Sequence, residues 1–147
     1  MKFIFKDLAT KLKEKGFDRP CYGFYDEENK LRLYLITNGN LSDCLKYGED
    51  SYINAPTIQQ VLKWLREEKD IHIESDICFR YTSEHKKDKN GTYSGYMNVS
   101  KPFWSFLIRK IKNGNCVYDN TTASNNEYQS YEDACIAGIE YVINNLI

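Results

Sequence analysis

The sequence predicts an α+β fold, with an antiparallel sheet of about five strands, two main helices packed on it and a short N-terminal helix. Three observations predict this class. Residues 56–69 and 130–147 carry apolar side chains at helical spacing behind N-capping residues. Several apolar and aromatic runs are separated by short polar turns, as in β-hairpins. Local hairpins combined with separate helices are typical of an α+β sandwich.

The composition is that of a folded domain, which we place at residues 1–147. Of these 147 residues, 28% are charged and 41% hydrophobic, and the formal net charge is -1. This length is sufficient to bury a core, and this charge gives no global attraction to nucleic acid or an anionic membrane. The five cysteines are dispersed, and the first residues lack the pattern of a signal peptide. We therefore expect free thiols in a cytoplasmic protein.

The first 55 residues are expected to form a short helix, a hairpin and a long loop. Apolar residues recur at helical spacing between Ile4 and Leu12, and Gly16 supplies a left-handed residue after the last turn. Two apolar runs then flank the polar stretch Asp26–Lys30, which is a hairpin pattern. Residues 38–55 are rich in Asn, Gly, Ser and Asp and predict an irregular loop. Long loops in small domains often carry function.

Two capped helices frame the second half of the chain. Thr57 caps the first, and four apolar residues at positions i, i+3, i+4 and i+7 predict its buried stripe: Ile58, Val61, Leu62 and Leu65. Ser130 caps the second, which runs to the end of the chain. Gly138 lies within the apolar stripe of this helix and would permit a close approach to the sheet.

Strands are expected between the two helices. Residues 71–81 predict a strand, and Glu84–Gly95 is a polar insertion that predicts the tip of a long hairpin, with a turn at Asn90–Gly91. Residues 103–111 predict a further strand. One face would carry Phe103, Ser105, Leu107 and Arg109, and the other Trp104, Phe106, Ile108 and Lys110. The Asn113–Gly114 pair predicts a tight turn to one more strand.

No recognisable catalytic, cofactor or metal motif is present, so we expect no enzyme activity, no cofactor and no metal. His72, Cys78 and His85 come nearest to a metal cluster, but their spacing matches no zinc pattern. The glycines form no phosphate-binding motif. An enzyme that uses carboxylates in residues 38–55 is a further option, and it would need a pocket near that loop.

Aromatic residues are the candidates for a partner-binding surface. They make up 14% of the chain, twelve of them tyrosines, and Tyr and Trp are frequent anchors of protein interfaces. Trp64 lies about 100° from the centre of its helix's apolar stripe, a position that fits either a contact residue or the core. We assign partner contacts to Trp64, Tyr22, Phe24 and Tyr34. The expected partner is a protein, with a second copy of this chain as one option.

Nucleic-acid binding is the alternative function. Two small basic groups at hairpin tips could contact phosphates, namely Lys86, Lys87 and Lys89, and Arg109, Lys110 and Lys112. From Thr57 onward, the order helix, three strands, helix is that of a double-stranded RNA-binding domain if residues 86–102 are set aside. Such a domain needs a basic helix N-terminus to reach phosphates, whereas the last helix here begins Ser-Tyr-Glu-Asp. We therefore interpret the order as shared architecture only.

Three segments of the chain carry a family resemblance. The phrases "APTIQQVLKWLREEKDIHI", "YQSYEDACIAGIEYVINNLI" and "KEKGFDRPCYGFY" resemble those of a group of small uncharacterised proteins from phages and prophages of gut bacteria. In that group, a helix of the "APT-x-QQ-x-x-x-W-x-R" type and an "IHI" strand accompany a closing "Y-x-x-YE-x-A" helix. The resemblance implies no activity. It implies a small accessory protein of a mobile element.

Overall fold

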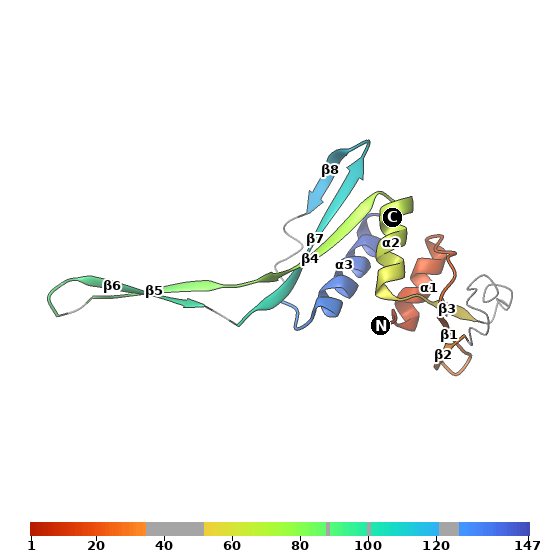
Figure 1. Cartoon of the computed structure of the whole chain (residues 1–147), viewed down its shortest axis with the longest axis horizontal. Helices are drawn as coiled ribbons and strands as arrows, with labels where there is room; N and C mark the ends of the chain where they lie inside the picture. The colour runs from red at the N-terminus through yellow and green to blue at the C-terminus, as the bar shows by residue number, and fades with distance from the viewer. Residues whose placement is uncertain (35–51, 88, 100, 121–126) are drawn as a thin grey trace.

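The computed structural model describes residues 1–34, 52–87, 89–99, 101–120 and 127–147 (Figure 1). It confirms the α+β class. Within the described residues, three helices and eight strands occur. In chain order, they are α1 (Lys6–Glu14), β1 (Gly23–Tyr25), β2 (Leu31–Leu33), β3 (Ile53–Ala55), α2 (Ile58–Glu68), β4 (Ile71–Cys78), β5 (Tyr81–Lys87), β6 (Tyr93–Val99), β7 (Phe103–Lys112), β8 (Asn115–Asn120) and α3 (Tyr131–Asn145).

The described strands are divided among three antiparallel units, where the sequence predicts one sheet of about five strands. One sheet has the order β2-β1-β3 and a second the order β4-β7-β8, while β5 and β6 form a separate hairpin. The pairing register of the strands explains why the sheet is divided. Cys78 pairs with Phe103 and Tyr81 with Val99, which leaves two residues on one strand opposite three on the other. Such a mismatch interrupts the ladder and turns the strands in a new direction.

The hairpin of β5 and β6, which we call the arm, extends away from the rest of the molecule (Figure 1). Its strands are longer than expected, because β5 continues to Lys87 and β6 begins at Tyr93, so that the turn is shorter than the predicted tip Glu84–Gly95. Gly91 adopts a left-handed conformation with φ of 82° at this turn, as its position after Asn90 predicts.

The core lies between the β4-β7-β8 sheet and the helices. The α3 helix packs on β4 and β7, and α2 packs on β4 and α3. Apolar side chains from these elements and α1 form one buried cluster, which includes Leu12, Val61, Ile108 and Ile139. The predicted stripe of α2, from Ile58 to Leu65, is buried. Among the described residues, no helix is both long and apolar enough to cross a membrane.

Capping residues define the helix ends as predicted. The Thr57 hydroxyl accepts the Gln60 amide while the Gln60 side chain accepts the Thr57 amide, a complete capping box at α2. At α1, Gly16 has φ of 89°, and the Phe17 amide donates to the Leu12 carbonyl at 2.9 Å. This Schellman arrangement brings Phe17 back over the helix end. The Ser130 hydroxyl accepts the Asp133 amide at the start of α3.

One strand lies where the sequence predicts an irregular loop. Ile53–Ala55 forms β3 and pairs with β1 through Gly23 and Ala55. Three residues carry too little pattern to reveal a strand, and this strand depends on the distant partner that it pairs with. Residues 38–51 of the expected loop lie outside the described residues.

The contact between α3 and the sheet is close at Gly138, as predicted. A Cβ atom built at this position would lie 2.7 Å from Cγ2 of Ile73 and 3.4 Å from the Phe106 ring. The absence of a side chain therefore sets the distance between α3 and the central strands β4 and β7.

Candidate functional site

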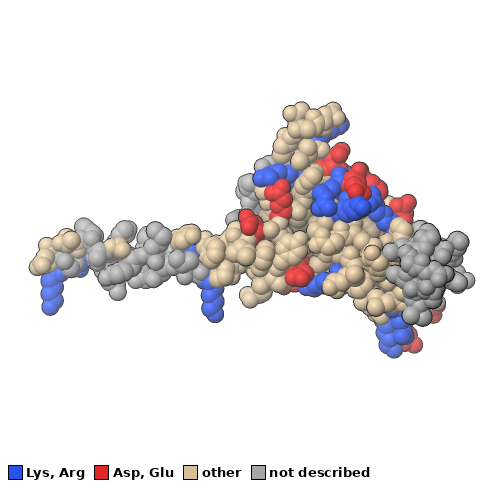
Figure 2. Space-filling model, in the orientation of Figure 1, with Lys and Arg blue, Asp and Glu red and all other residues tan. Residues whose placement is uncertain are grey.

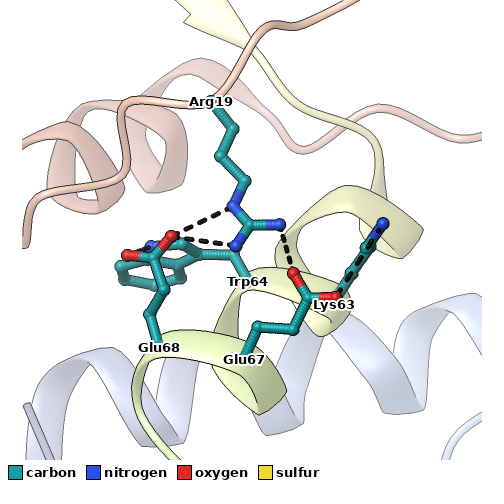
Figure 3. A network of polar contacts seen from close by, with 5 residues as sticks. All are labelled: Arg19, Lys63, Trp64, Glu67 and Glu68. Carbon is teal, nitrogen blue, oxygen red and sulfur yellow. Dashed lines mark hydrogen bonds and ion pairs between the residues drawn. The ribbon is translucent and has the colours of Figure 1, made fainter.

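Trp64 belongs to the core, which corrects its assignment as a partner contact. Its side chain is 0% exposed. The Phe17 ring meets it edge-on with centroids 5.4 Å apart, and the Lys69 ammonium lies 5.0 Å from the ring centroid. The indole N–H donates to the Glu68 carboxylate at 2.9 Å (Figure 3). Phe17 covers the side of α2 next to its apolar stripe. The buried face of this helix is therefore wider than the predicted stripe of four apolar residues.

An ion-pair network lies directly over Trp64 (Figure 3). The Arg19 guanidinium donates to Glu67 at 2.6 Å and to Glu68 at 3.1 and 2.9 Å. These hydrogen bonds raise the pKa of Arg19 and lower the pKa values of Glu67 and Glu68. Both carboxylates are exposed to solvent and Arg19 is half-buried, so the network adds little stability. It does fix the segment before β1 against α2.

A pocket of about 680 Å³ lies beside this network, between the first turns of α2 and α3. Four chain segments line it: the N-terminal residues, the segment from Arg19 to Tyr22, the first turns of α2 from Thr57 to Lys63, and Tyr131 with Glu132 at the start of α3. The volume is typical of sites for small molecules. Of the residues that line this pocket, only Tyr22 was predicted from the sequence to lie at a binding surface. The four segments are far apart in the sequence, so no local pattern indicates that they meet.

Three cationic side chains line the pocket, and carboxylates outside the lining hold each of them. Lys2 pairs with Asp133 at 3.0 Å, and Lys63 lies 3.8 Å from Glu67, which also binds Arg19. Hydrogen bonds from Ser130 and from Lys2 lower the pKa of Asp133. The cations are thus oriented by partners that do not occupy the pocket.

Tyr131 connects the pocket with the core. Hydrogen bonding with Cys135 raises the pKa of its hydroxyl, and hydrogen bonding with Gln59 opposes this effect. The Cys135 sulfur lies 3.3 Å from the Ser75 hydroxyl, and the Tyr131 ring meets Trp104 edge-on at 5.4 Å. These contacts fix the ring of Tyr131 at the wall of the pocket.

The other three predicted contact residues lie together. One face of the β2-β1-β3 sheet carries the side chains of Tyr22, Phe24 and Tyr34, and all three are half-buried. The Phe24 ring lies 4.8 Å from Tyr34 and 5.1 Å from Tyr52, measured between centroids. The structure therefore groups these residues on an aromatic sheet face, with Tyr22 at the pocket, and separates them from the buried Trp64.

The predicted basic groups lie at the ends of two different hairpins. Lys87 and Lys89 are exposed at the arm turn, whereas the side chain of Lys86 lies outside the described residues. Arg109 on β7 donates to both Glu74 oxygens at 2.9 Å. Lys110 is half-buried and Lys112 exposed near the β7–β8 turn. Figure 2 shows basic side chains projecting from the arm, whereas acidic and basic groups mix on the body.

Metal ligands do not gather in the part of the chain that the structure describes. No group of three His, Cys, Asp or Glu residues there could hold an ion. Cys78 contacts the Ser105 hydroxyl at 3.0 Å. His72 pairs with Arg109 across β4 and β7, whereas His85 lies in the arm, and its side chain is not among those described.

Large apolar side chains are exposed where the body meets the arm, a feature that the sequence reasoning missed. Ile77, Phe79 and Tyr81 occupy alternate positions and are 45%, 47% and 62% exposed. Ile71 and Ile73 are buried at alternate positions under the helices, and apolar residues recur at alternate positions further along the chain, where the helices no longer cover them. This pattern in the sequence could have indicated the exposed apolar residues. We call Ile77, Phe79 and Tyr81 the junction patch.

No protein-family model, curated protein or solved structure matches this chain.

Proposed function

We propose that this protein is a non-catalytic, cytoplasmic protein-interaction module that contacts its partner with the arm and the junction patch. The projection of the arm carries the proposal. Within the described chain, β5 and β6 pair only with each other, and the hairpin extends away from the core (Figure 1). A two-stranded hairpin without a core is marginally stable in water. Its open edges are available to another chain.

The junction patch favours a protein as that partner. Three apolar residues at alternate positions in the sequence, each more than two-fifths exposed, lie where the arm leaves the sheet. Exposed apolar groups of this kind are typical of protein interfaces. Aromatic residues such as Phe79 and Tyr81 are frequent anchors in them.

The charge of the arm indicates the chemistry of the partner. The arm with its flanking residues, 79–102, contains five basic and two acidic side chains, whereas the rest of the chain contains fifteen basic and nineteen acidic ones. Three of the five basic residues lie within the arm itself, and Arg80 in the flank pairs with Glu127. An apolar surface bordered by carboxylates would complement the arm and its junction patch. We therefore infer a protein partner with an acidic, apolar contact surface. The role of accessory protein in a mobile element is consistent with this proposal and rests on the sequence resemblance alone.

Nucleic-acid binding is the second candidate, and exposed Lys87 and Lys89 at the arm turn favour it. Two observations favour it less. Glu74 engages Arg109 of the other basic group through both carboxylate oxygens. The junction patch also offers apolar rather than cationic groups at the arm base.

Removing the arm tests the proposal. Cys78 and Phe103 are paired neighbours on β4 and β7, so an Asn-Gly turn can join them directly in place of residues 79–102. The variant is expected to unfold cooperatively, with a thermal midpoint within a few degrees of that of the full chain, because the core lies in the body. It is also expected to lose its partner.

A double substitution tests the junction patch in the full-length chain. Changing Phe79 and Tyr81 to Ser is expected to weaken partner binding by about 30-fold or more, the effect of losing an interface anchor worth about 2 kcal/mol. The matched control is Val117→Ser on β8, since Val117 is 59% exposed and lies outside the junction patch.

The measurement begins with proteins captured from host lysate by the full chain and by each variant. A protein that the full chain captures, but that neither the armless variant nor the Phe79/Tyr81 double variant captures, is then purified. Its affinity for the full chain is measured by calorimetry at two salt concentrations. Direct binding that depends on the junction patch and weakens with salt supports the proposal. Three results would contradict it: unaltered capture by the armless variant, self-association alone in light scattering, or arm-dependent binding of nucleic acid alone.

A further inference from the structure

The pocket between α2 and α3 has walls suited to a flat organic group. Tyr22 and Tyr131 contribute aromatic side chains, and Pro20 and Ile58 contribute apolar surface. The Tyr131 ring is held from behind by Trp104 and by the hydrogen bonds of its hydroxyl. A volume of about 680 Å³ is ample for a single ring system with a substituent.

Cationic side chains from three separate segments line the same pocket, and each of them pairs with a carboxylate outside the lining. Lys2, Arg19 and Lys63 line it, against the single lining carboxylate of Glu132. The carboxylates that orient these cations, among them Asp133 and Glu67, lie outside the lining. A ligand that enters the pocket would therefore meet cations that are already positioned, which reduces the cost of ordering them.

The backbone adds to this field. Thr57, the N-cap of α2, lines the pocket, and so do the first two residues of α3. Both helices therefore begin at its wall. The first turn of α2 carries no acidic residue, so the positive end of its dipole attracts an anion, whereas Glu132 and Asp133 offset the dipole of α3. The helix end is a secondary contribution beside the cavity and its three cations.

The geometry points to a binding site for a small organic anion, a molecule with a flat ring and one phosphate or carboxylate group. The ring lies against the side chains of Tyr22 and Tyr131. The anionic group faces Lys63 and Lys2 near the start of α2. This site is distinct from the arm, so it can exist whether or not the arm binds a protein.

The test is a titration of the isotopically labelled full-length protein, followed by amide chemical shifts in NMR. The probes are AMP, which has a ring and a phosphate, and benzoate, which has a ring and a carboxylate. Adenosine supplies only the ring, and inorganic phosphate supplies only the anionic group. Either ring-bearing anion is expected to give saturable shifts at Thr57–Gln60 and at Tyr131, with at least tenfold weaker binding of adenosine and phosphate. AMP alone would assign the site to phosphates, and benzoate alone to carboxylates.

A matched pair of variants distinguishes the pocket from general charge attraction. Lys63→Gln is expected to weaken the ring-bearing anion about tenfold. Arg66→Gln removes the same charge from the same helix, at an exposed residue outside the pocket lining, and is expected to leave binding unchanged. The inference is overturned if neither anion gives saturable shifts at the pocket, if adenosine binds equally well, or if both variants weaken binding alike.

Discussion

Replacing Trp64 with Ala is expected to lower the free energy of unfolding by about 3–5 kcal/mol. Trp64 is fully buried, and its ring fills the space between α2 and Phe17. Its removal leaves a cavity that the rigid helix cannot close. Small domains are stable by about 5–15 kcal/mol, so this single change would remove a large part of the total.

Urea denaturation followed by far-ultraviolet circular dichroism measures this loss. Two control variants separate its causes. Trp64→Phe keeps most of the ring volume but loses the hydrogen bond to Glu68. Glu68→Gln keeps the ring and removes the charge of its exposed partner, which also pairs with Arg19. Both controls are expected to cost clearly less than Trp64→Ala. A loss below about 1 kcal/mol for Trp64→Ala would contradict the burial of this side chain.

Replacing Gly138 with Val is expected to destabilise the fold by about 3 kcal/mol, the upper range for overpacking a core. The first added carbon alone would lie 2.7 Å from Cγ2 of Ile73. Ile73 is β-branched and buried, so its methyl group cannot rotate away without disturbing β4. Gly138→Ala should cost less, because Ala gains about 1 kcal/mol of helix propensity over Gly.

A double-mutant cycle identifies the clash. Ile73→Leu removes the methyl group nearest to Gly138 while keeping the side-chain volume, so it should recover part of the stability lost in Gly138→Ala. Equilibrium unfolding of the four proteins gives the coupling energy. Strict additivity of the two changes would contradict a direct contact between these positions.

The helix caps, the turns and the close approach of α3 to the sheet at Gly138 were predictable because patterns within a few residues indicate them. Thr57 with Gln60 and Gly16 with Phe17 each act within a few residues along the chain. Gly138 is recognisable from the apolar stripe of its own helix, although the residues that it approaches, Ile73 and Phe106, are distant in sequence. The largely apolar stretch 103–111 likewise predicted the central strand β7.

Features that depend on distant segments could not be predicted in this way. Trp64 is buried because Phe17 covers it after α1 ends, which no pattern in α2 reveals. β3 forms by pairing with β1, and the sheet divides where two residues oppose three beyond Cys78. The pocket combines four segments. Among the predicted contact residues, only those on neighbouring strands, such as Phe24 and Tyr34, lie together.

Site-specific photocrosslinking from the junction patch tests the central claim most directly. A photoreactive phenylalanine analogue replaces Tyr81, an exposed aromatic residue, in the full-length protein within host cells, and the same analogue replaces Val117 on β8 as the control. We predict a single dominant crosslinked protein from position 81 that is absent from position 117. No crosslinked protein from position 81, or the same products from both positions, would contradict the role of the arm in partner binding.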